Sequence, residues 1–201
     1  MKIEVDKIVE TLQAGGVILI ATDTVYGLAS LPHINNAVSK IYELKKRPRD
    51  MHLPIMVSKI QNLEKLGIDI NINTKKLLNS NLVPGAISFV VGFNNANLKP
   101  EWLKGRDEIA FRIPDNELLL NILDKVEILL VTSANLHGTQ FTPNNVTDIL
   151  LQLNGSPDLV IEDGDGKEIP STIINCRLVP PKIERLGLIS ETKIKKILEN
   201  E

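Results

Sequence analysis

The sequence predicts an α/β fold in which a mixed β-sheet is flanked by helices. Short apolar runs of strand length alternate with segments whose apolar residues recur at helical spacing. The two kinds of segment do not follow a strict strand-helix-strand rhythm, which favours a mixed sheet over a doubly wound parallel one. No internal repeat, low-complexity segment or linker-like stretch divides the chain. We therefore expect one domain over residues 1–201, with its core at about 5–187.

The first helix is predicted over residues 5–12, and Gly15-Gly16 follows it as a C-cap would. Continuous apolar runs indicate buried strands, and the predicted strands are 17–21, 55–57, 87–91, 109–113, 128–132, 159–162, 171–175 and 182–186. Further helices are predicted at 36–44, through 63 and 66, and at 118–123, 146–153 and 189–198. Pro84-Gly85 and the sequence Asp-Gly-Asp-Gly at 163–166 indicate turns.

Composition restricts the kind of ligand and the compartment. The chain has 23 Lys and Arg against 25 Asp and Glu, so an overall field that attracts nucleic acid is not expected and any anion site must be local. Cys176 is the single cysteine, which excludes an intrachain disulfide, fits a reducing compartment and favours core filling over a nucleophile. The start does not look like a signal peptide, and no apolar run approaches the ~20 residues that span a bilayer. A cytoplasmic protein without membrane contact is expected.

Small polar residues follow two predicted strands. The segment 21–29 contains Thr22, Thr24 and Gly27, and Ser133-Ala134-Asn135 follows the strand at 128–132. Hydroxyl and amide side chains at the carboxyl end of a strand can line a ligand crevice and bind phosphate or ribose. The alternative is a strand-to-helix loop whose hydroxyls satisfy only local backbone groups. No Gly-x-Ser-x-Gly sequence is present, so a nucleophile elbow is excluded.

A basic segment, Lys45-Lys46-Arg47-Pro48-Arg49, ends the predicted helix at 36–44. Pro48 disfavours helical backbone at Arg47 and so holds its guanidinium outside the helix. Arginine suits bidentate phosphate contacts and lysine supplies a compact charge, which together indicate a nucleotide-phosphate site. The alternative is a solvated cap that complements the helix dipole. No Gly-x-x-x-x-Gly-Lys-Ser/Thr sequence occurs, so the chain is not a P-loop protein.

Arg112 lies within the apolar strand predicted at 109–113. A buried guanidinium requires a paired anion. That anion is either a structural carboxylate such as Asp115 or the carboxylate of a ligand, and both remain open at this point. The three histidines show no metal-ligand spacing, so a structural zinc site is not expected.

Taken together and in order, these segments resemble the YrdC-type threonylcarbamoyl-AMP synthases, also called TsaC, from about Gly16 to Gly187. The resemblance implies a YrdC-like single domain with a twisted mixed sheet and a concave basic groove, in the short form that lacks the extra C-terminal domain of longer relatives. The matching sequences are Thr22–Leu28, Lys45–Pro48, Pro84-Gly85, Arg112–Pro114, Ser133–Asn135 with Gly138, Pro170–Thr172 and Arg185–Gly187.

The resemblance implies a nucleotidyltransferase that makes threonylcarbamoyl-AMP and pyrophosphate from ATP, L-threonine and bicarbonate or CO2. The product would serve N6-threonylcarbamoyladenosine formation at position 37 of tRNAs that read codons beginning with A. Mg2+ would be held mainly through ATP. Weak contact with tRNA and a downstream transferase complex of the TsaD/TsaB/TsaE type are the implied macromolecular partners.

The same resemblance implies roles for individual residues. Threonine would be bound by Thr24, Tyr26, Arg112 and Ser171. ATP would be bound by Lys45, Arg47, Ser133, Asn135 and Arg185, of which Lys45 and Arg47 would be catalytic because they neutralise charge on the phosphates. Lys46 and Arg49 are expected to be solvated. The sequence departs from the family pattern at Ala86, at Met51-His52 and at His137.

Two other functions remain open. One is the formation of carbamoyl-adenylate in hydrogenase maturation, although no zinc-finger or acylphosphatase-like segment accompanies the domain. The other is a non-catalytic RNA-binding module that uses the same groove. Aromatic residues make up only 3% of the chain, which leaves few side chains for base stacking and disfavours the RNA-binding alternative.

Overall fold

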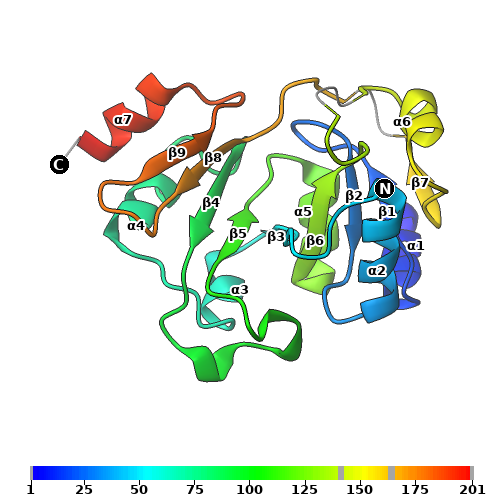
Figure 1. Ribbon diagram of the computed structural model, residues 1–201, viewed down its shortest axis with the longest axis horizontal. Coiled ribbons are helices and arrows are strands. Elements are labelled where there is room, and N and C mark those ends of the chain that lie inside the picture. The colour runs from blue at the N-terminus through cyan, green and yellow to red at the C-terminus, as the bar shows by residue number, and fades with distance from the viewer. Residues whose placement is uncertain (1, 140–142, 163–165, 200–201) are drawn as a thin grey trace.

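The computed structural model describes residues 2–139, 143–162 and 166–199 (Figure 1). Its described strands form one nine-stranded sheet in the order β7-β1-β2-β6-β3-β5-β4-β8-β9. The strands are β1 (Ile18–Ile20), β2 (Gly27–Ser30), β3 (Ile55–Val57), β4 (Ile87–Val91), β5 (Ile109–Arg112), β6 (Ile128–Ser133), β7 (Leu159–Ile161), β8 (Thr172–Asn175) and β9 (Lys182–Arg185). The pairs β1–β7, β3–β5 and β4–β8 are parallel and the others antiparallel, so the predicted mixed sheet is confirmed.

Helices cover both faces of this sheet. They are α1 (Lys2–Gln13), α2 (Asn35–Lys45), α3 (Ile60–Glu64), α4 (Ile72–Leu78), α5 (Glu117–Val126), α6 (Val146–Gln152) and α7 (Glu191–Glu199), with two 3-10 turns, η1 (Ala96–Leu98) and η2 (Glu101–Leu103). In Figure 1, α1 and α7 lie toward opposite ends of the sheet. Among the described helices, none combines the length and the apolar character that crossing a membrane requires.

The period of two along each strand divides the core between the two faces. In β1, Ile18 and Ile20 pack with the apolar side chains of α1 and α5, whereas Leu19 packs on the other face with residues of α2. All three β1 side chains are fully buried. Each such burial stabilises the fold by about 1.5–3 kcal/mol relative to an exposed side chain.

Among the described strands and α-helices, β2 and α4 were missed by the sequence prediction. The segment read as a loop contains β2, which is buried at all four residues and joins β1 to β6. Gly27 belongs there because a Cβ at this position would lie 2.8 Å from the Val131 Cγ1 atom of β6. The polar helix α4 was also missed; its N-cap is Asn71, whose side chain accepts a hydrogen bond from the Thr74 N–H at 3.0 Å.

The remaining predicted elements are present with boundaries shifted by no more than a few residues. The turn predicted at 163–166 has its first three residues outside the described part of the chain. Cys176 is fully buried, and burial raises the pKa of its thiol to about 11. A thiol with that pKa is a poor nucleophile at neutral pH, so the prediction that Cys176 fills the core is confirmed.

Candidate anion-binding pocket

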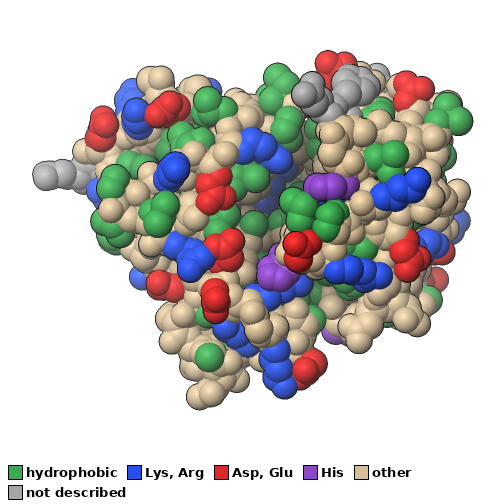
Figure 2. Space-filling model, viewed as in Figure 1, with side chains coloured by type: hydrophobic (Ala, Val, Ile, Leu, Met, Phe, Trp, Pro, Cys, Tyr) green, Lys and Arg blue, Asp and Glu red, His purple; other side chains and the backbone are tan. Residues whose placement is uncertain are grey.

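A pocket of about 500 Å³ opens on one side of the sheet, above strands β3 to β6 and beside β8 and β9. Figure 2 shows the hollow near the middle of the face in view, with Lys and Arg side chains in and below it. Four arginines line the pocket: Arg47, Arg106, Arg112 and Arg185. The acidic residues of its lining, Asp50, Glu108 and Glu184, are all exposed. Positive charge is therefore carried by guanidinium groups, and the carboxylates face solvent.

Arg112 lies at one end of the pocket and is held by three protein oxygens. Its Nε donates to the Gly85 carbonyl at 2.9 Å, and Nη1 donates to the Thr24 hydroxyl at 2.8 Å. Its Nη2 lies 2.5 Å from Asp23 Oδ1, an ion contact without hydrogen-bond geometry. Burial lowers the pKa of Arg112, while Asp23 raises it. The guanidinium is fixed in place but keeps N–H groups that a ligand could use.

The structural anion opposite Arg112 is thus Asp23. The candidate named from the sequence, Asp115, was wrong: it is exposed, whereas the side chain of Asp23 is only 9% exposed. Asp23 follows β1, and Arg112 ends β5, so their contact depends on the order of strands in the sheet. Adjacency along the chain pointed to the wrong carboxylate.

The hydroxyls of the Thr22–Thr24 segment serve both the backbone and the pocket. Thr22 Oγ1 donates to the Val25 carbonyl at 2.7 Å and accepts from the Thr24 N–H at 3.0 Å. Thr24 Oγ1 in turn accepts from Arg112. Both threonines and the buried Tyr26 line the pocket. The local hydrogen bonds therefore orient Thr24 toward Arg112, so the hydroxyls do not serve local backbone groups alone; ligand binding by this segment stays a prediction.

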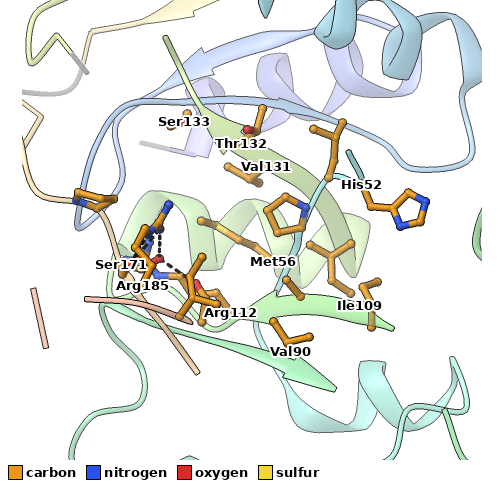
Figure 3. Close-up of a pocket in the computed structure, with 18 of the residues that line it drawn as sticks. His52, Met56, Val90, Ile109, Arg112, Val131, Thr132, Ser133, Ser171 and Arg185 are labelled. Carbon is orange, nitrogen blue, oxygen red and sulfur yellow. Dashed lines mark hydrogen bonds between the residues drawn. The ribbon is translucent and has the colours of Figure 1, made fainter. Parts of the chain in front are cut away.

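Ser171 and Arg185 lie at the same end of the pocket as Arg112 (Figure 3). Arg185 Nη2 donates to the Ser171 carbonyl at 2.8 Å, and the Ser171 hydroxyl lies 2.8 Å from that of Ser88. A Cβ at Gly187 would overlap the carbonyl oxygen of Pro170. The glycine in the Arg185-Leu186-Gly187 sequence is therefore required for the chain to pass the Pro170-Ser171 backbone.

Lys45 does not line the pocket. It is 2% exposed, and its ammonium group donates to the backbone carbonyls of Ser133 and, at 2.6 Å, of Asn135. Burial, with a smaller contribution from Arg47, lowers the pKa of Lys45 to about 7. The His137 N–H donates back to the Lys45 carbonyl at 2.8 Å. The end of α2 and the segment after β6 thus form one hydrogen-bonded unit.

The backbone at Lys46 and Arg47 explains how the Arg47 side chain leaves helix α2. Lys46 adopts a left-handed conformation with φ 48°, and the Arg47 N–H donates to the Tyr42 carbonyl at 2.9 Å, which ends α2. Arg47 Nε and Nη2 donate to the Met51 and His52 carbonyls at 3.0 and 3.1 Å. These bonds hold the Arg47 side chain along the wall of the pocket, as the Pro48 argument predicted.

The nine predicted site residues fall into two groups, those that line the pocket and those that do not. Thr24, Tyr26, Arg112 and Ser171 line the pocket, as do Arg47, Ser133 and Arg185. Lys45 and Asn135 are buried behind it: the Ser133 hydroxyl donates to Asn135 Oδ1 at 2.6 Å. Lys46 is exposed as expected, and Arg49, also exposed, lies over the Tyr42 ring with 4.9 Å to its centroid.

Sequence reasoning gave no role to two residues that line the pocket, Ser88 and Arg106, or to Asp23, which contacts Arg112. Ser88 carried a signal, because it stands where the family pattern has a hydroxyl. Asp23 stood in a quoted sequence but was given no role. No signal in the sequence marked Arg106, because it lies in a loop with no recognisable pattern.

Fold and pocket together define an α/β protein with a mixed sheet and an arginine-lined pocket. The model of the Sua5/YciO/YrdC family, described as "Telomere recombination", matches residues 10–187. The chain belongs to this family, which confirms the resemblance to YrdC-type proteins.

Relatives that carry a name include the threonylcarbamoyl-AMP synthases of Bacillus subtilis and Pyrococcus abyssi. The first is 29% identical over 189 residues, covering 93% of this chain and 54% of that protein. The second is 27% identical over 190 residues, covering 93% and 55%. The chain spans about half the length of these two relatives.

Solved structures confirm the fold. The crystal structure of P. abyssi Sua5 complexed with L-threonine has a TM-score of 0.86 and 26% identity, covering 99% of this chain and 58% of that one. The crystal structure of Escherichia coli YciO has a TM-score of 0.83 and 25% identity, covering 94% and 92%. YciO of E. coli is named an uncharacterized protein. Family membership alone therefore does not decide the reaction.

Proposed function

We propose that this chain carries a threonylcarbamoyl-AMP synthase activity, with ATP, L-threonine and bicarbonate or CO2 as substrates. The product would supply threonylcarbamoylation of adenosine 37 in tRNAs that read codons beginning with A. The observation that carries the proposal is the fixed Arg112 guanidinium, beside the hydroxyl of Thr24 at one end of the pocket. The relatives named threonylcarbamoyl-AMP synthase, and the Sua5 structure with L-threonine, support it.

Threonine would bind at the Arg112 end. Its carboxylate would take an Arg112 N–H group that Gly85, Thr24 and Asp23 do not use. Thr24 and Ser171 would offer hydroxyls to the amino acid, and the buried Tyr26 would form part of the wall. A fixed guanidinium suits this role because little conformational entropy remains to be lost on binding.

ATP would bind along the wall formed by Arg47, Ser133 and Arg185. Asn135 would orient the Ser133 hydroxyl, to which it is hydrogen-bonded. Lys45 would act through the Ser133 and Asn135 carbonyls that it holds, and a direct phosphate contact would require it to leave them. Lys45 therefore becomes a positioning residue in this proposal, and Arg47 is the direct phosphate ligand.

The reaction needs a nucleophile and charge neutralisation. The threonine amine takes up CO2 to give a carbamate, whose oxygen attacks the α-phosphorus in line. A new P–O bond forms as the bond to pyrophosphate breaks. Arg47 would offset the charge that develops on pyrophosphate, and the two ends of the pocket would hold the reacting atoms together. No covalent intermediate with the protein is required.

A protein-held Mg2+ site does not fit the side chains in the described ranges. They contain no group of three or more His, Cys, Asp or Glu side chains placed to hold a metal ion. The carboxylates of the pocket, Asp50, Glu108 and Glu184, are exposed at its rim. We propose accordingly that any Mg2+ is carried in by the ATP phosphates.

The test is incubation with ATP, Mg2+, bicarbonate and L-threonine, with pyrophosphate release as the readout. Release that requires threonine, and falls strongly when serine replaces it, is expected. Release that requires carbamoyl phosphate and does not depend on threonine would favour carbamoyl-adenylate formation instead. The crystal structure of full-length HypF in the phosphate- and nucleotide-bound form shares the fold of this chain, with a TM-score of 0.76 and 15% identity. No nucleotide turnover together with a steep salt dependence of tRNA binding would favour an RNA-binding module.

The cellular setting belongs to the same proposal. A labile acyl-adenylate product calls for a nearby acceptor enzyme, and a transferase complex of the TsaD/TsaB/TsaE type is the expected one. Direct contact with tRNA would be weak, because the whole chain carries a net charge of -2. The reaction would take place in the cytoplasm, where ATP and tRNA are found.

A further inference from the structure

Arg106 is the arginine of the pocket to which neither the sequence motifs nor the proposed mechanism assigns a role. It follows the turn η2 and Gly105, whose φ of +76° lets the backbone reverse there. The Arg106 N–H donates to the Leu103 carbonyl at 3.2 Å, and the Arg106 carbonyl accepts from Lys99 Nζ at 2.7 Å. The backbone that carries Arg106 is therefore fixed on both sides of the peptide.

Arg106 lines the pocket, and its guanidinium has no hydrogen-bond or ion-pair partner among the described residues. Its Nη1 atom is buried and makes no hydrogen bond, and no carboxylate of the described residues lies within 4.0 Å of it. Arg47, Arg112 and Arg185 each donate to at least one protein oxygen. An unpartnered buried donor on a charged group is unfavourable and calls for a ligand.

Arg47 and Arg106 line the same pocket. Arg47 Nη2 donates to the His52 carbonyl at 3.1 Å. Burial and, after it, the positive charge of Arg106 lower the pKa of His52. In Figure 3, His52 lies at the opposite end of the pocket from Ser171, Arg112 and Arg185, with Met56 between them. Both arginines thus line the pocket on the side of His52, at the end away from Arg112.

We propose that Arg106 and Arg47 together bind the polyphosphate of the nucleotide, with Arg106 on the phosphates that leave as pyrophosphate. Two cations suit an anion that carries several charges, whereas one guanidinium suffices for the carboxylate of an amino acid. The exposed Glu108 does not compete for Arg106, because it is paired with Arg177. The identity of the nucleotide rests on the proposed function, but the polyphosphate site does not.

The test is calorimetric titration with inorganic pyrophosphate, ATP and adenosine at constant Mg2+ and salt. Arg106→Gln should weaken pyrophosphate and ATP binding about 10- to 100-fold, with adenosine affinity changed less than twofold. Arg106→Lys should lie between the wild type and Arg106→Gln, since it keeps the charge but loses the bidentate fork. Thermal unfolding of each variant establishes that it is folded.

Lys104→Ala is the matched control. Lys104 is an exposed cation of the same loop and pairs with Glu101, so its loss should change pyrophosphate affinity less than twofold. Equal losses in Lys104→Ala and Arg106→Gln would show a general charge effect and overturn the inference. So would Arg106→Gln with wild-type pyrophosphate affinity.

The inference and the proposed function fail in different ways. If pyrophosphate binding depends on Arg106 but no threonine-dependent turnover occurs, the polyphosphate site stands and the reaction is wrong. If threonine-dependent turnover occurs and Arg106→Gln binds pyrophosphate as the wild type does, the reaction stands and the role of Arg106 is wrong.

Discussion

The two ends of the pocket use arginine in opposite ways. At one end Arg112 is buried and touches three protein oxygens, from Asp23, Thr24 and Gly85. At the other end Arg106 touches none among the described residues, and one of its nitrogen atoms is buried without a partner. An arginine held by the protein presents a few N–H groups in a fixed direction. An arginine without partners among the described residues keeps N–H groups for an incoming anion.

Lys45 and Arg47, two positions apart in the chain, show the same difference between a cation held by the protein and a cation that faces the pocket. The ammonium group of Lys45 is directed into the protein, where it joins the end of α2 to the segment after β6. Arg47 emerges beyond the left-handed Lys46 and lines the pocket. A shared basic sequence therefore supplies one structural cation and one ligand-facing cation.

The largest expected effect tests whether Arg112 is held as the structure indicates. Arg112→Ala should lower the free energy of unfolding by about 3–5 kcal/mol, because it leaves the carboxylate of Asp23 buried without its cation. Urea unfolding followed by circular dichroism measures this loss.

The double variant Asp23→Ala/Arg112→Ala is the control for that effect. It removes both charges and should be less destabilised than the two single variants summed, by at least about 1 kcal/mol. Strictly additive losses would mean that the two side chains do not stabilise each other.

A second expected effect concerns pH and Lys45. The pKa of Lys45 is lowered from 10.5 to about 7 in the folded protein. Between these values the unfolded chain binds a proton that the folded chain has released, so stability should rise with pH by at most about 1.4 kcal/mol per unit. The rise should extend from about pH 7 toward 10.5 and disappear in Lys45→Met.

Urea unfolding of wild type and Lys45→Met at pH 7, 8 and 9 measures that difference. The two proteins share every other titrating side chain. Any change with pH in the difference between their free energies of unfolding is therefore due to Lys45. A constant gap across this range would contradict the burial of a lysine with a lowered pKa.

The smallest expected effect concerns the Ser88–Ser171 contact at the Arg112 end. Ser88→Ala removes one hydrogen bond between neutral, buried hydroxyls and should cost about 0.5–1.5 kcal/mol of stability. Threonine affinity, measured by calorimetry, should fall less than in Arg112→Ala. A larger fall in threonine affinity in Ser88→Ala than in Arg112→Ala would indicate that the pair Ser88 and Ser171, and not Arg112, dominates threonine binding.

Most of the fold followed from local patterns in the sequence. Continuous apolar runs gave strands such as Ile87–Val91, and helical spacing gave α1 and α5. The strand β2 was missed because hydroxyls and a glycine interrupt its segment, and its place in the sheet depends on β6, about one hundred residues away. Register between distant strands leaves no local trace in the sequence.

The candidate site was predictable where residue type and motif agreed. Arg112 in an apolar strand required an anion on physical grounds, but the choice of Asp23 over Asp115 depended on strand order. Lys45 and Arg47 were assigned one role because a one-dimensional sequence does not give the direction of a side chain at the end of a helix. Arg106 could not be found because its significance lies in the absence of a partner among the described residues.

The most direct test of a pocket with two different ends is a crossed binding measurement. L-threonine and ATP are each titrated by calorimetry into wild type, Arg47→Ala and Arg112→Ala. Arg47→Ala should weaken ATP binding by roughly 10- to 150-fold and leave threonine affinity within twofold, and Arg112→Ala should do the reverse. Equal losses of both ligands in both variants would contradict the separation of the two ends.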